Sequence, residues 1–233
     1  MPESAPNAYD EMPYINKAFP QTHPDRLAAL ARLFGVESAD VETCRVLELG
    51  CASGDNLIPM ALGLPGATFL GLDYSPRQVA DGQRSIDALG LANIELRHAD
   101  IADVDAAWGS FDYIVAHGIY SWVPAPIRAK VLAICRQNLA PNGVAFVSYN
   151  TYPGWRQREM VRDIMLYHSA PIPGAQEKVK QARALLDFLA QNVPADTAYG
   201  TALRQEVEHL RSEDDAYVFH DHLEQDNQPV YFH

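Results

Sequence analysis

VLELGCASGDN, at residues 46–56, passes from a short apolar run into a loop of small residues that contains two glycines. Such a run before a glycine turn is typical of the first strand of a parallel α/β sheet, where the turn lets backbone N–H groups approach a ligand. A NAD site requires the spacing G-x-G-x-x-G, whereas this loop has Gly50, Ala52 and Gly54, with Glu48 two residues before the first glycine. The loop therefore favours a ligand other than NAD.

Apolar runs and helix-like stretches alternate around this loop. Strands connected by helices must lie parallel, because right-handed crossovers cover both faces of the sheet. We therefore expect an α/β fold with a Rossmann-like, doubly wound parallel sheet, and a ligand at the carboxyl ends of its strands. The expected strands are 46–49, 68–73, 94–98, 113–116 and 144–149, and the expected helices are a first one from Pro24 that stops at Gly35, then 55–62, 76–89 and 126–138.

The hydrophobic pattern of each strand predicts its place in the sheet. Residues 94–98 alternate between apolar and charged side chains, which indicates a half-exposed edge strand. Residues 113–116 are apolar throughout and should be central, and residues 144–149 should also be buried. A turn at Pro141-Asn142-Gly143 is expected before that last strand.

The composition changes after Asn150, where apolar stripes at helical spacing predict a mainly helical region. We divide the chain into an N-terminal lid segment and helix (1–35), a ligand-binding sheet domain (36–150) and a helical acceptor-side region (151–233), which we expect to be truncated. An uncovered fifth strand would favour pairing with another chain as a homodimer. The alternative is a short pairing of residues 217–220 with 230–232.

Bulk properties exclude several classes of protein. The formal charge of −12 argues against nucleic acid as a partner, and no stretch is long and apolar enough to be a membrane span, so we expect a cytoplasmic globule. Cys44, Cys51 and Cys135 lack the spacing of a disulfide framework or a zinc site. His220-x-His222 with His233 lacks supporting ligands, so no metal is expected.

Three acidic residues predict the chemistry of the ligand. Glu48 would repel a phosphate but attract an ammonium group. Asp73 ends the second strand roughly 20 residues after Gly50, which is the position of a carboxylate that accepts ribose hydroxyls. Asp100 follows the third strand and is placed to accept from an adenine amino group while Ile101 packs on the ring. An amino acid, a ribose and an adenine together describe S-adenosylmethionine.

Four segments, VLELGCASGDN, FLGLDYSP, RHADIADV and FDYIVAHGIYSWVP, resemble the successive cofactor motifs of class I S-adenosylmethionine-dependent methyltransferases. They cover residues 45–150. More narrowly, FPQTHPDRLAALARLFGV, SYNTYPGW and HDHLEQDNQPVYFH resemble bacterial methyltransferases that carry an additional regulatory region, a group that includes the rickettsial protein-lysine methyltransferases. In this group the chain continues well beyond the last motif.

This resemblance implies a role for each motif residue. The loop, with Gly50, Cys51, Ala52 and Gly54, would surround the methionine part of the cofactor. The other implied contacts are Asp73 and Tyr74 with the ribose and the adenine face, Asp100 and Ile101 with the base, and the His117 carbonyl with the methionine amine. Ala52 departs from the glycine common at this position. Plainer roles remain open: Asp100 as a helix cap and Cys51 as a small packed residue.

Methyl transfer is an in-line displacement, so holding the acceptor in position matters most. The acceptor should enter above strands four and five, where HGIYSWVP and SYNTYPGW concentrate aromatic side chains that attract an amine by cation–π interaction. Tyr120 or Tyr152 is expected to orient the acceptor or help to remove its proton. The N-terminal segment, with Tyr14, Phe19 and His23, is expected to fold over the cofactor as a lid.

The leading function is therefore a methyltransferase that acts on a protein side chain, most readily lysine. A small-molecule O- or N-methyltransferase would use the same cofactor site. A regulatory module that binds the cofactor without activity of its own is another alternative. A NAD-dependent dehydrogenase is disfavoured by Glu48 and by the glycine spacing.

Overall fold

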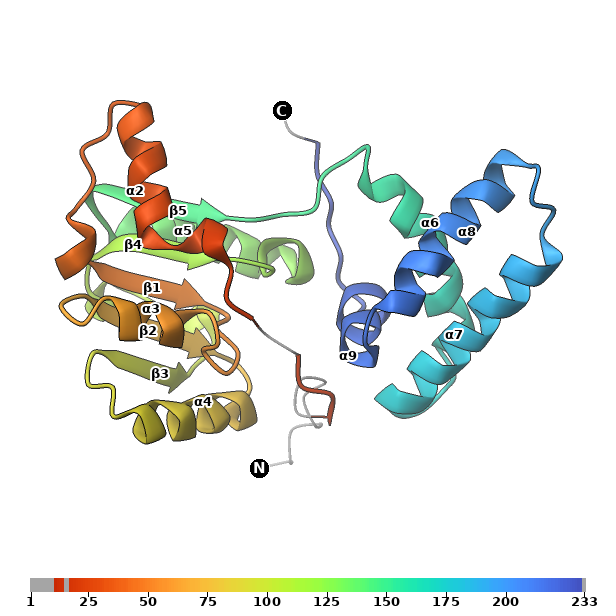
Figure 1. Cartoon of the computed structure of the whole chain (residues 1–233), viewed down its shortest axis with the longest axis horizontal. Helices are drawn as coiled ribbons and strands as arrows, with labels where there is room; N and C mark the ends of the chain where they lie inside the picture. Colours follow the sequence, from red (N-terminus) through yellow and green to blue (C-terminus); the bar gives the residue numbers. More distant parts are fainter. Residues whose placement is uncertain (1–10, 15–16, 232–233) are drawn as a thin grey trace. The chain divides into compact units, whose positions relative to one another are not determined.

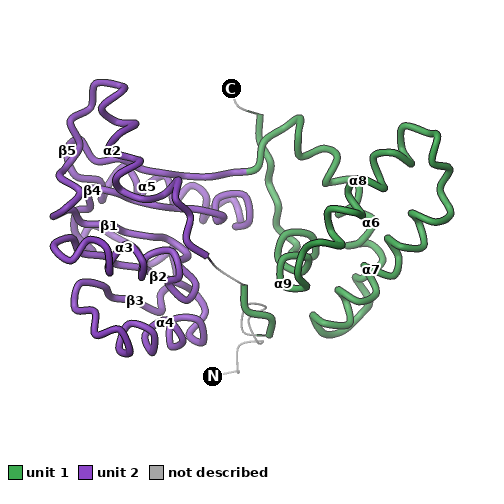
Figure 2. The backbone as a smooth tube through the Cα atoms, in the orientation of Figure 1, with its two compact units in different colours: residues 1–15, 150–233 green, residues 16–149 purple. Residues whose placement is uncertain are grey.

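The computed structural model describes residues 11–14 and 17–231, and these form two compact units (Figure 2). The sheet unit spans residues 16–149. The helical unit joins residues 150–233 to the described part of residues 1–15. Each unit has its own hydrophobic core.

A parallel sheet of five strands forms the centre of the sheet unit (Figure 1). The strand order is β3-β2-β1-β4-β5, and every neighbouring pair is parallel. The order reverses between β1 and β4, which makes their carboxyl ends the topological switch point of the sheet. The strands are β1 (Arg45–Leu49), β2 (Thr68–Asp73), β3 (Ile94–His98), β4 (Phe111–Ala116) and β5 (Leu139–Val147).

Helices cover both faces of this sheet, as the strand–helix alternation predicted. One core packs three helices against Val46, Phe69 and Tyr113, and the other packs a single helix against residues that include Leu47 and Ile114. The first group is α2 (Pro24–Leu33), α3 (Leu57–Gly63) and α4 (Pro76–Leu89), and the single helix is α5 (Ala125–Asn138). Because α2 packs into this core, it belongs with the sheet. The short turns of the unit are η1 (Pro20–Thr22), η2 (Val41–Thr43), η3 (Ile101–Asp103), η4 (Ala106–Trp108) and η5 (Tyr120–Trp122).

The edge position of β3 is confirmed. Ile94 and Leu96 are buried, whereas Glu95 and Arg97 are exposed, because only one face of this strand is covered. Its neighbouring helix, α4, begins and ends where side-chain chemistry predicted. The Ser75 hydroxyl accepts from the Gln78 backbone N–H, and Gly90 ends the helix in the left-handed conformation.

The prediction that the fifth strand is buried is wrong. β5 lies at the other edge of the sheet, and none of its residues is fully buried. It also begins earlier than expected, since the pairing with β4 jumps from Phe111–Leu139 to Tyr113–Val144. The expected turn at residues 141–143 is therefore a bulge within β5, with Asn142 in the left-handed region.

The helical unit confirms the mainly helical C-terminal region. Its core residues include Val179, Leu186, Leu203 and Leu210, which form the two apolar stripes seen in the sequence. The helices are α6 (Trp155–Ser169), α7 (Ala175–Asn192), α8 (Ala198–Ser212) and α9 (Asp215–Val218), followed by the π-helical turn η6 (Phe219–Leu223).

The alternative pairing of residues 217–220 with 230–232 is wrong. Residues 217–220 are helical, because Val218 and Phe219 pack into the core of the helical unit. Val230 instead bridges to Thr151 in parallel. In this bridge the Tyr152 N–H donates to the Val230 carbonyl, and the Val230 N–H donates to the Asn150 carbonyl, both at 3.0 Å.

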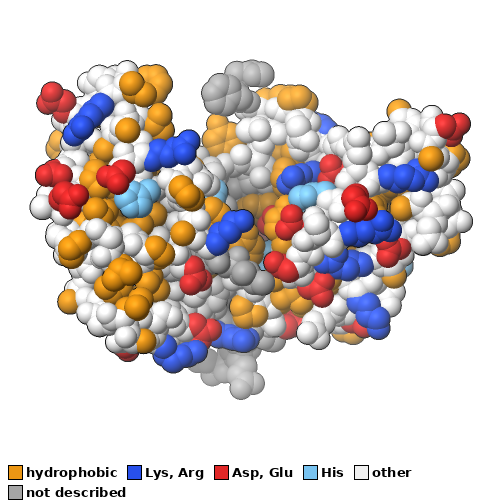
Figure 3. All heavy atoms as spheres, in the orientation of Figure 1, with side chains coloured by type: hydrophobic (Ala, Val, Ile, Leu, Met, Phe, Trp, Pro, Cys, Tyr) orange, Lys and Arg blue, Asp and Glu red, His pale blue; other side chains and the backbone are white. Residues whose placement is uncertain are grey.

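The face drawn in Figure 3 carries acidic and basic side chains interspersed over each unit. On this face no extended area of positive charge gathers that would suit a phosphate backbone. None of the helices in the described part of the chain is both long enough and apolar enough to cross a membrane.

Candidate functional site

The carboxyl ends of the parallel strands gather most of the predicted site residues at one edge of the sheet. The loop 50–54 follows β1, Asp73 and Tyr74 lie at the end of β2, Asp100 and Ile101 follow β3, and His117 follows β4. Adjacent strands lie about 4.8 Å apart. The structure therefore brings these residues together along one edge, in the order of the strands.

The backbone conformation of the glycine loop explains why small residues occur at positions 50, 52 and 54. Gly50, Ala52 and Gly54 all have positive φ, at 71°, 49° and 76°. Two N–H groups, of Gly50 and Cys51, donate to the Leu72 carbonyl at 2.8 and 2.9 Å, which turns the chain sharply out of β1. Alanine is thus the one residue of the three that carries a side chain in the left-handed region, where a Cβ is unfavourable.

Cys51 is a packed residue. Its side chain is fully buried, and a Cβ at Gly71 on β2 would lie 2.6 Å from the Cys51 Sγ. Burial raises the pKa of the Cys51 thiol well above its ordinary value, so the thiolate form that a nucleophile requires is disfavoured.

Asp73 connects β2 to the glycine loop. One carboxylate oxygen accepts from the Ala52 N–H and the other accepts from the Ser75 N–H, both at 2.8 Å. Burial raises the pKa of Asp73, and these backbone donors oppose the shift. Each oxygen keeps capacity for a further donor, as a ribose hydroxyl would be.

Glu48 is a buried carboxyl group in the middle of the sheet, with only 4% of its surface exposed. Its Oε1 accepts from the Asn56 Nδ2 at 2.7 Å, while its Oε2 is buried without a hydrogen-bond partner among the described residues. Burial raises the pKa of Glu48 to about 7, the Asn56 hydrogen bond opposes this shift, and the charge of Asp73 adds to it. An unpaired buried carboxylate oxygen is costly, so this atom is suited to a cationic group.

Asp100 and Tyr74 flank the outer part of the edge. The Asp100 carboxylate accepts from the Ala102 N–H at 2.8 Å and so caps η3, which is the plainer role left open by the sequence. A carboxylate has capacity for further donors. Tyr74 is 61% exposed, with its ring 6.5 Å from that of His98, and Ile101 is half-buried.

His117 lies at the switch point and is held from several sides. Its Nδ1 lies 2.8 Å from the Ser148 Oγ, which also accepts from the Gly118 N–H. The Phe19 ring stands edge-on to the imidazole at 4.2 Å, and the Gln21 amide nitrogen lies 3.5 Å from Nε2. Burial lowers the pKa of His117, and the charge of Lys17 lowers it further.

The two predicted catalytic tyrosines lie in different units. Tyr120 is in the sheet unit, and its ring lies 6.1 Å from that of Tyr149 in an edge-to-face arrangement. Tyr152 is in the helical unit, where its hydroxyl bonds to Glu159 and the Arg156 guanidinium stacks 3.9 Å from its ring centre.

The three predicted lid residues are divided between the two units. Tyr14 belongs to the helical unit, where its ring lies edge-on to His220 at 5.7 Å. The His23 side chain accepts from the Asp25 N–H and caps α2. Phe19 lies beside a predicted cofactor residue, His117. Residues 1–10 and 15–16 of the predicted lid lie outside the described residues.

His220 and His222, near the end of the chain, are buried within the helical unit. The His220 Nε2 lies 2.6 Å from the Met12 carbonyl oxygen, and its Nδ1 lies 3.2 Å from Glu224. His222 is fully buried, which lowers its pKa to about 3. The described residues contain no group of three His, Cys, Asp or Glu side chains arranged to hold a metal ion, and His233 lies outside them.

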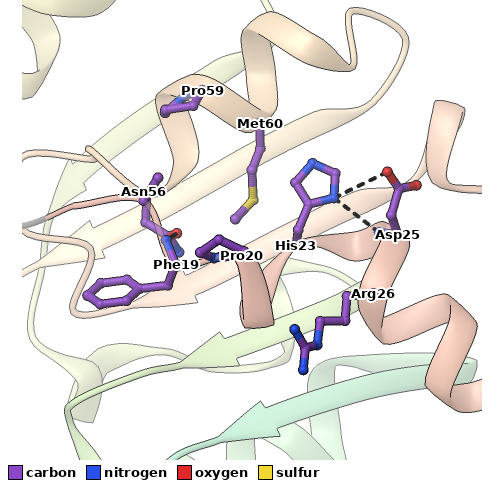
Figure 4. A pocket seen from close by; sticks show the side chains of 9 residues that line it. Phe19, Pro20, His23, Asp25, Arg26, Asn56, Pro59 and Met60 are labelled. Carbon is purple, nitrogen blue, oxygen red and sulfur yellow. Dashed lines mark hydrogen bonds and ion pairs between the residues drawn. The ribbon is translucent and has the colours of Figure 1, made fainter.

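Asn56 and Thr22 are the buried site residues that sequence reasoning missed. Both are fully buried and hydrogen bonded to each other beside Glu48. Asn56 also lines a pocket of about 450 Å³ between η1, the start of α2 and α3, together with the apolar side chains of Pro20, Pro59 and Met60 (Figure 4). The available signal was an asparagine two residues after the last glycine of the loop, a position that is equally typical of a helix cap.

Comparison with known proteins connects this geometry to a family. A family model described as a methyltransferase domain matches residues 46–143, which contain the glycine loop, Asp73, Asp100 and His117. The uncharacterized protein RP028 of Rickettsia prowazekii is 37% identical over 97% of this chain and 91% of its own length. The uncharacterized protein RP789 of the same organism is 44% identical over 97% of this chain.

A solved structure has the same fold over nearly the whole chain. PKMT2 from Rickettsia typhi, in complex with AdoHcy, matches 95% of this chain with a TM-score of 0.85 and 39% identity. The chain spans 41% of the length of RP789 and 43% of the PKMT2 chain.

Proposed function

Because the chain belongs to the class I S-adenosylmethionine-dependent methyltransferases, we propose that it transfers a methyl group from S-adenosylmethionine to a protein side chain, with the amine of lysine as acceptor. The observation that carries the proposal is the row of acidic side chains Glu48, Asp73 and Asp100 near the carboxyl ends of three neighbouring strands, β1, β2 and β3. At about 4.8 Å per strand this row covers about 10 Å, which suits an extended adenosyl amino acid.

The residues along this edge fit that cofactor from end to end. The free Oε2 of Glu48 suits the ammonium group of the methionine part. Asp73 presents two oxygens for the ribose hydroxyls, and the exposed Tyr74 offers an aromatic face beside them. Asp100 would accept from the adenine amino group, and Ile101 would pack on the adenine ring. Gly50, Ala52 and Gly54 of the loop after β1 have positive φ and carry no large side chain of their own.

S-adenosylmethionine, when bound, supplies a methyl group on a cationic sulfur that a nucleophile in line can displace. The chain has to orient the acceptor and let it lose a proton, since lysine has a reference pKa of about 10.4. Tyr120 and Tyr149 stand after β4 and β5, on the acceptor side of the switch point, and their rings suit a cationic amine. Tyr152 is less suited to proton removal, because burial and the bond to Glu159 raise its pKa.

The choice of a protein acceptor is supported by relatives. PKMT2 is similar over 95% of this chain, and the motifs at residues 148–155 and 220–233 resemble those of the rickettsial protein-lysine methyltransferases. The small-molecule methyltransferase remains the competing proposal, because it requires the same cofactor residues.

The decisive experiment follows the methyl group. The full chain is incubated with S-[methyl-³H]adenosylmethionine and bacterial lysate, the products are separated by size, and the labelled residue is identified by mass spectrometry. We expect label in the protein fraction, on lysine. Label in the small-molecule fraction would support the competing acceptor class. Cofactor binding without transfer to either fraction would support a regulatory module.

A further inference from the structure

The N-terminal residues 17–22, which we call the strap, contact both strands of the switch point. The strap reaches β4 through His117, which meets the Phe19 ring at 4.2 Å and the Gln21 amide at 3.5 Å. It reaches β1 through one side chain, Asn56, which bonds to Glu48. The strap therefore crosses the part of the sheet edge where we place the amino acid end of the cofactor.

Asn56 is fully buried and uses both ends of its amide. Its Oδ1 accepts from the Phe19 N–H at 2.8 Å, and its Nδ2 donates to the Glu48 Oε1 at 2.7 Å and to the Thr22 hydroxyl at 3.0 Å. The amide orientation has one solution, because a backbone N–H can only donate and an ionised carboxylate can only accept. Asn56 therefore presents a donor to Glu48 whenever the strap is in place.

The position of Asn56 supports a role beyond helix capping. It directly precedes α3, where asparagine ordinarily bonds to the free N–H groups of the first turn. Asn56 makes no such bond, because its side chain is engaged by Glu48 and the strap. The helix thus forgoes a cap that contributes about 1 kcal/mol.

We propose that Asn56 is a positioning residue for cofactor binding: it holds the Glu48 carboxylate with one oxygen free for the ammonium group and fastens the strap over the same crevice. The inference rests on the proposed function in taking an adenosyl amino acid as the ligand. The free Oε2 is the independent observation that points to a cationic group at this place.

The titration of Glu48 supplies a readout that a merely structural asparagine would not move. The Asn56 donor lowers the Glu48 pKa against the effect of burial. The other titratable groups that face Glu48 are Asp73 at the end of β2 and the Cys51 thiol. Removing the donor shifts the ionisation of Glu48 to higher pH, so the pH range in which the ammonium group binds well shifts upward too.

The test compares two ligands by calorimetry between pH 6 and pH 9. S-adenosylhomocysteine carries the ammonium group, whereas methylthioadenosine keeps the adenosine and lacks the amino acid part. Asn56→Leu removes the amide at nearly equal size, and Asn56→Ser serves where the leucine variant does not fold. Thr22→Val loosens the strap and leaves the Asn56–Glu48 bond in place.

We expect Asn56→Leu to weaken S-adenosylhomocysteine binding about tenfold or more at pH 7, the loss of one hydrogen bond to a charged group. Binding should recover toward higher pH, and methylthioadenosine should bind with less than about a threefold change. In Thr22→Val the pH range should stay where it is in the wild type. Because Asn56 acts on the ammonium group through Glu48, the loss of affinity in the double variant Glu48→Gln/Asn56→Leu should be smaller than the sum of the two single losses.

The binding measurements distinguish a failure of the proposed function from a failure of the inference about Asn56. If the wild-type chain binds neither ligand, the proposed function is wrong. If the wild type binds S-adenosylhomocysteine but Asn56→Leu matches its affinity and pH range, or the double variant shows additive losses, the inference is overturned and the proposed function stands. Asn138 is a buried asparagine before the amino end of β5, where its amide donates to the Asp105 and Gly109 carbonyls. Asn138→Asp therefore serves as a control for the effect of destabilisation alone.

Discussion

The Asp73 carboxylate accepts a hydrogen bond from the Ala52 N–H at 2.8 Å, so the end of β2 holds the middle of the glycine loop that follows β1. The same side chain holds the Ser75 N–H with its second oxygen. A residue expected only to bind a ribose thus also shapes the loop that would surround the methionine part. Changes at Asp73 should therefore affect both stability and cofactor binding, in contrast with changes at Asp100.

Asp73→Asn removes one of the two acceptors and leaves a backbone N–H without its partner. We expect the free energy of unfolding to fall by about 1–3 kcal/mol and S-adenosylhomocysteine to bind at least about tenfold more weakly. Asp100→Asn is the matched control, because asparagine caps a helix as well as aspartate does. It should reduce affinity while leaving stability within about 0.5 kcal/mol. Urea unfolding and calorimetry measure both. Equal stability losses in the two variants would contradict this distinction.

Ala52→Gly tests the strain in the loop. A residue with a Cβ in the left-handed conformation destabilises the folded state by roughly 1–2 kcal/mol, and Ala52→Gly removes this strain. The greater freedom of glycine in the unfolded chain opposes that gain by about 0.4–1 kcal/mol. We expect the glycine variant to be more stable by up to about 1 kcal/mol, with cofactor affinity retained. Ala52→Val, which is β-branched, should lose stability. Urea midpoints at constant slope report the change, and a glycine variant clearly less stable than the wild type would argue against this backbone conformation.

Much of the fold follows from local patterns. Apolar runs located the strands, the alternation at residues 94–98 placed β3 at an edge, and Ser75 and Gly90 marked the ends of α4. The edge position of β5 was missed, because an apolar run indicates a strand but does not say whether a neighbour covers it. The helical state of residues 217–220 was missed because packing within the helical unit overrides their β propensity.

The site was predictable where it depends on strand ends and not where it depends on distant contacts. Parallel strands bring their carboxyl ends to one edge, so the residues after β1, β2, β3 and β4 could be grouped from the sequence. The role of Asn56 depends on Phe19 and Thr22, which lie 37 and 34 residues away, and no local pattern shows that contact. Likewise, Tyr14 could not be assigned to the helical unit without its packing on His220.

Glu48→Gln should alter how stability depends on pH. The folded state raises the Glu48 pKa from 4.5 to about 7, so the folded protein binds the extra proton in this interval and the wild type loses stability as pH rises through it. The loss is on the order of 3 kcal/mol. Glutamine does not titrate. We therefore expect the free energy of unfolding of the variant, relative to that of the wild type, to rise by on the order of 3 kcal/mol between pH 4.5 and pH 8. Urea unfolding without ligand measures this difference. A constant difference across this range would show that Glu48 stays ionised.

Tyr120→Phe tests the acceptor side of the site. The variant keeps the ring beside Tyr149 and removes the hydroxyl, so S-adenosylhomocysteine affinity should not change. If the hydroxyl orients the acceptor amine, methyl transfer to the protein fraction should slow about tenfold, the contribution of one well-placed hydrogen bond. Tyr152→Phe is the matched control, because that hydroxyl is already bonded to Glu159, and we expect its rate to stay within about twofold of the wild type. A slow Tyr152→Phe with a normal Tyr120→Phe would move the acceptor-orienting role to the helical unit.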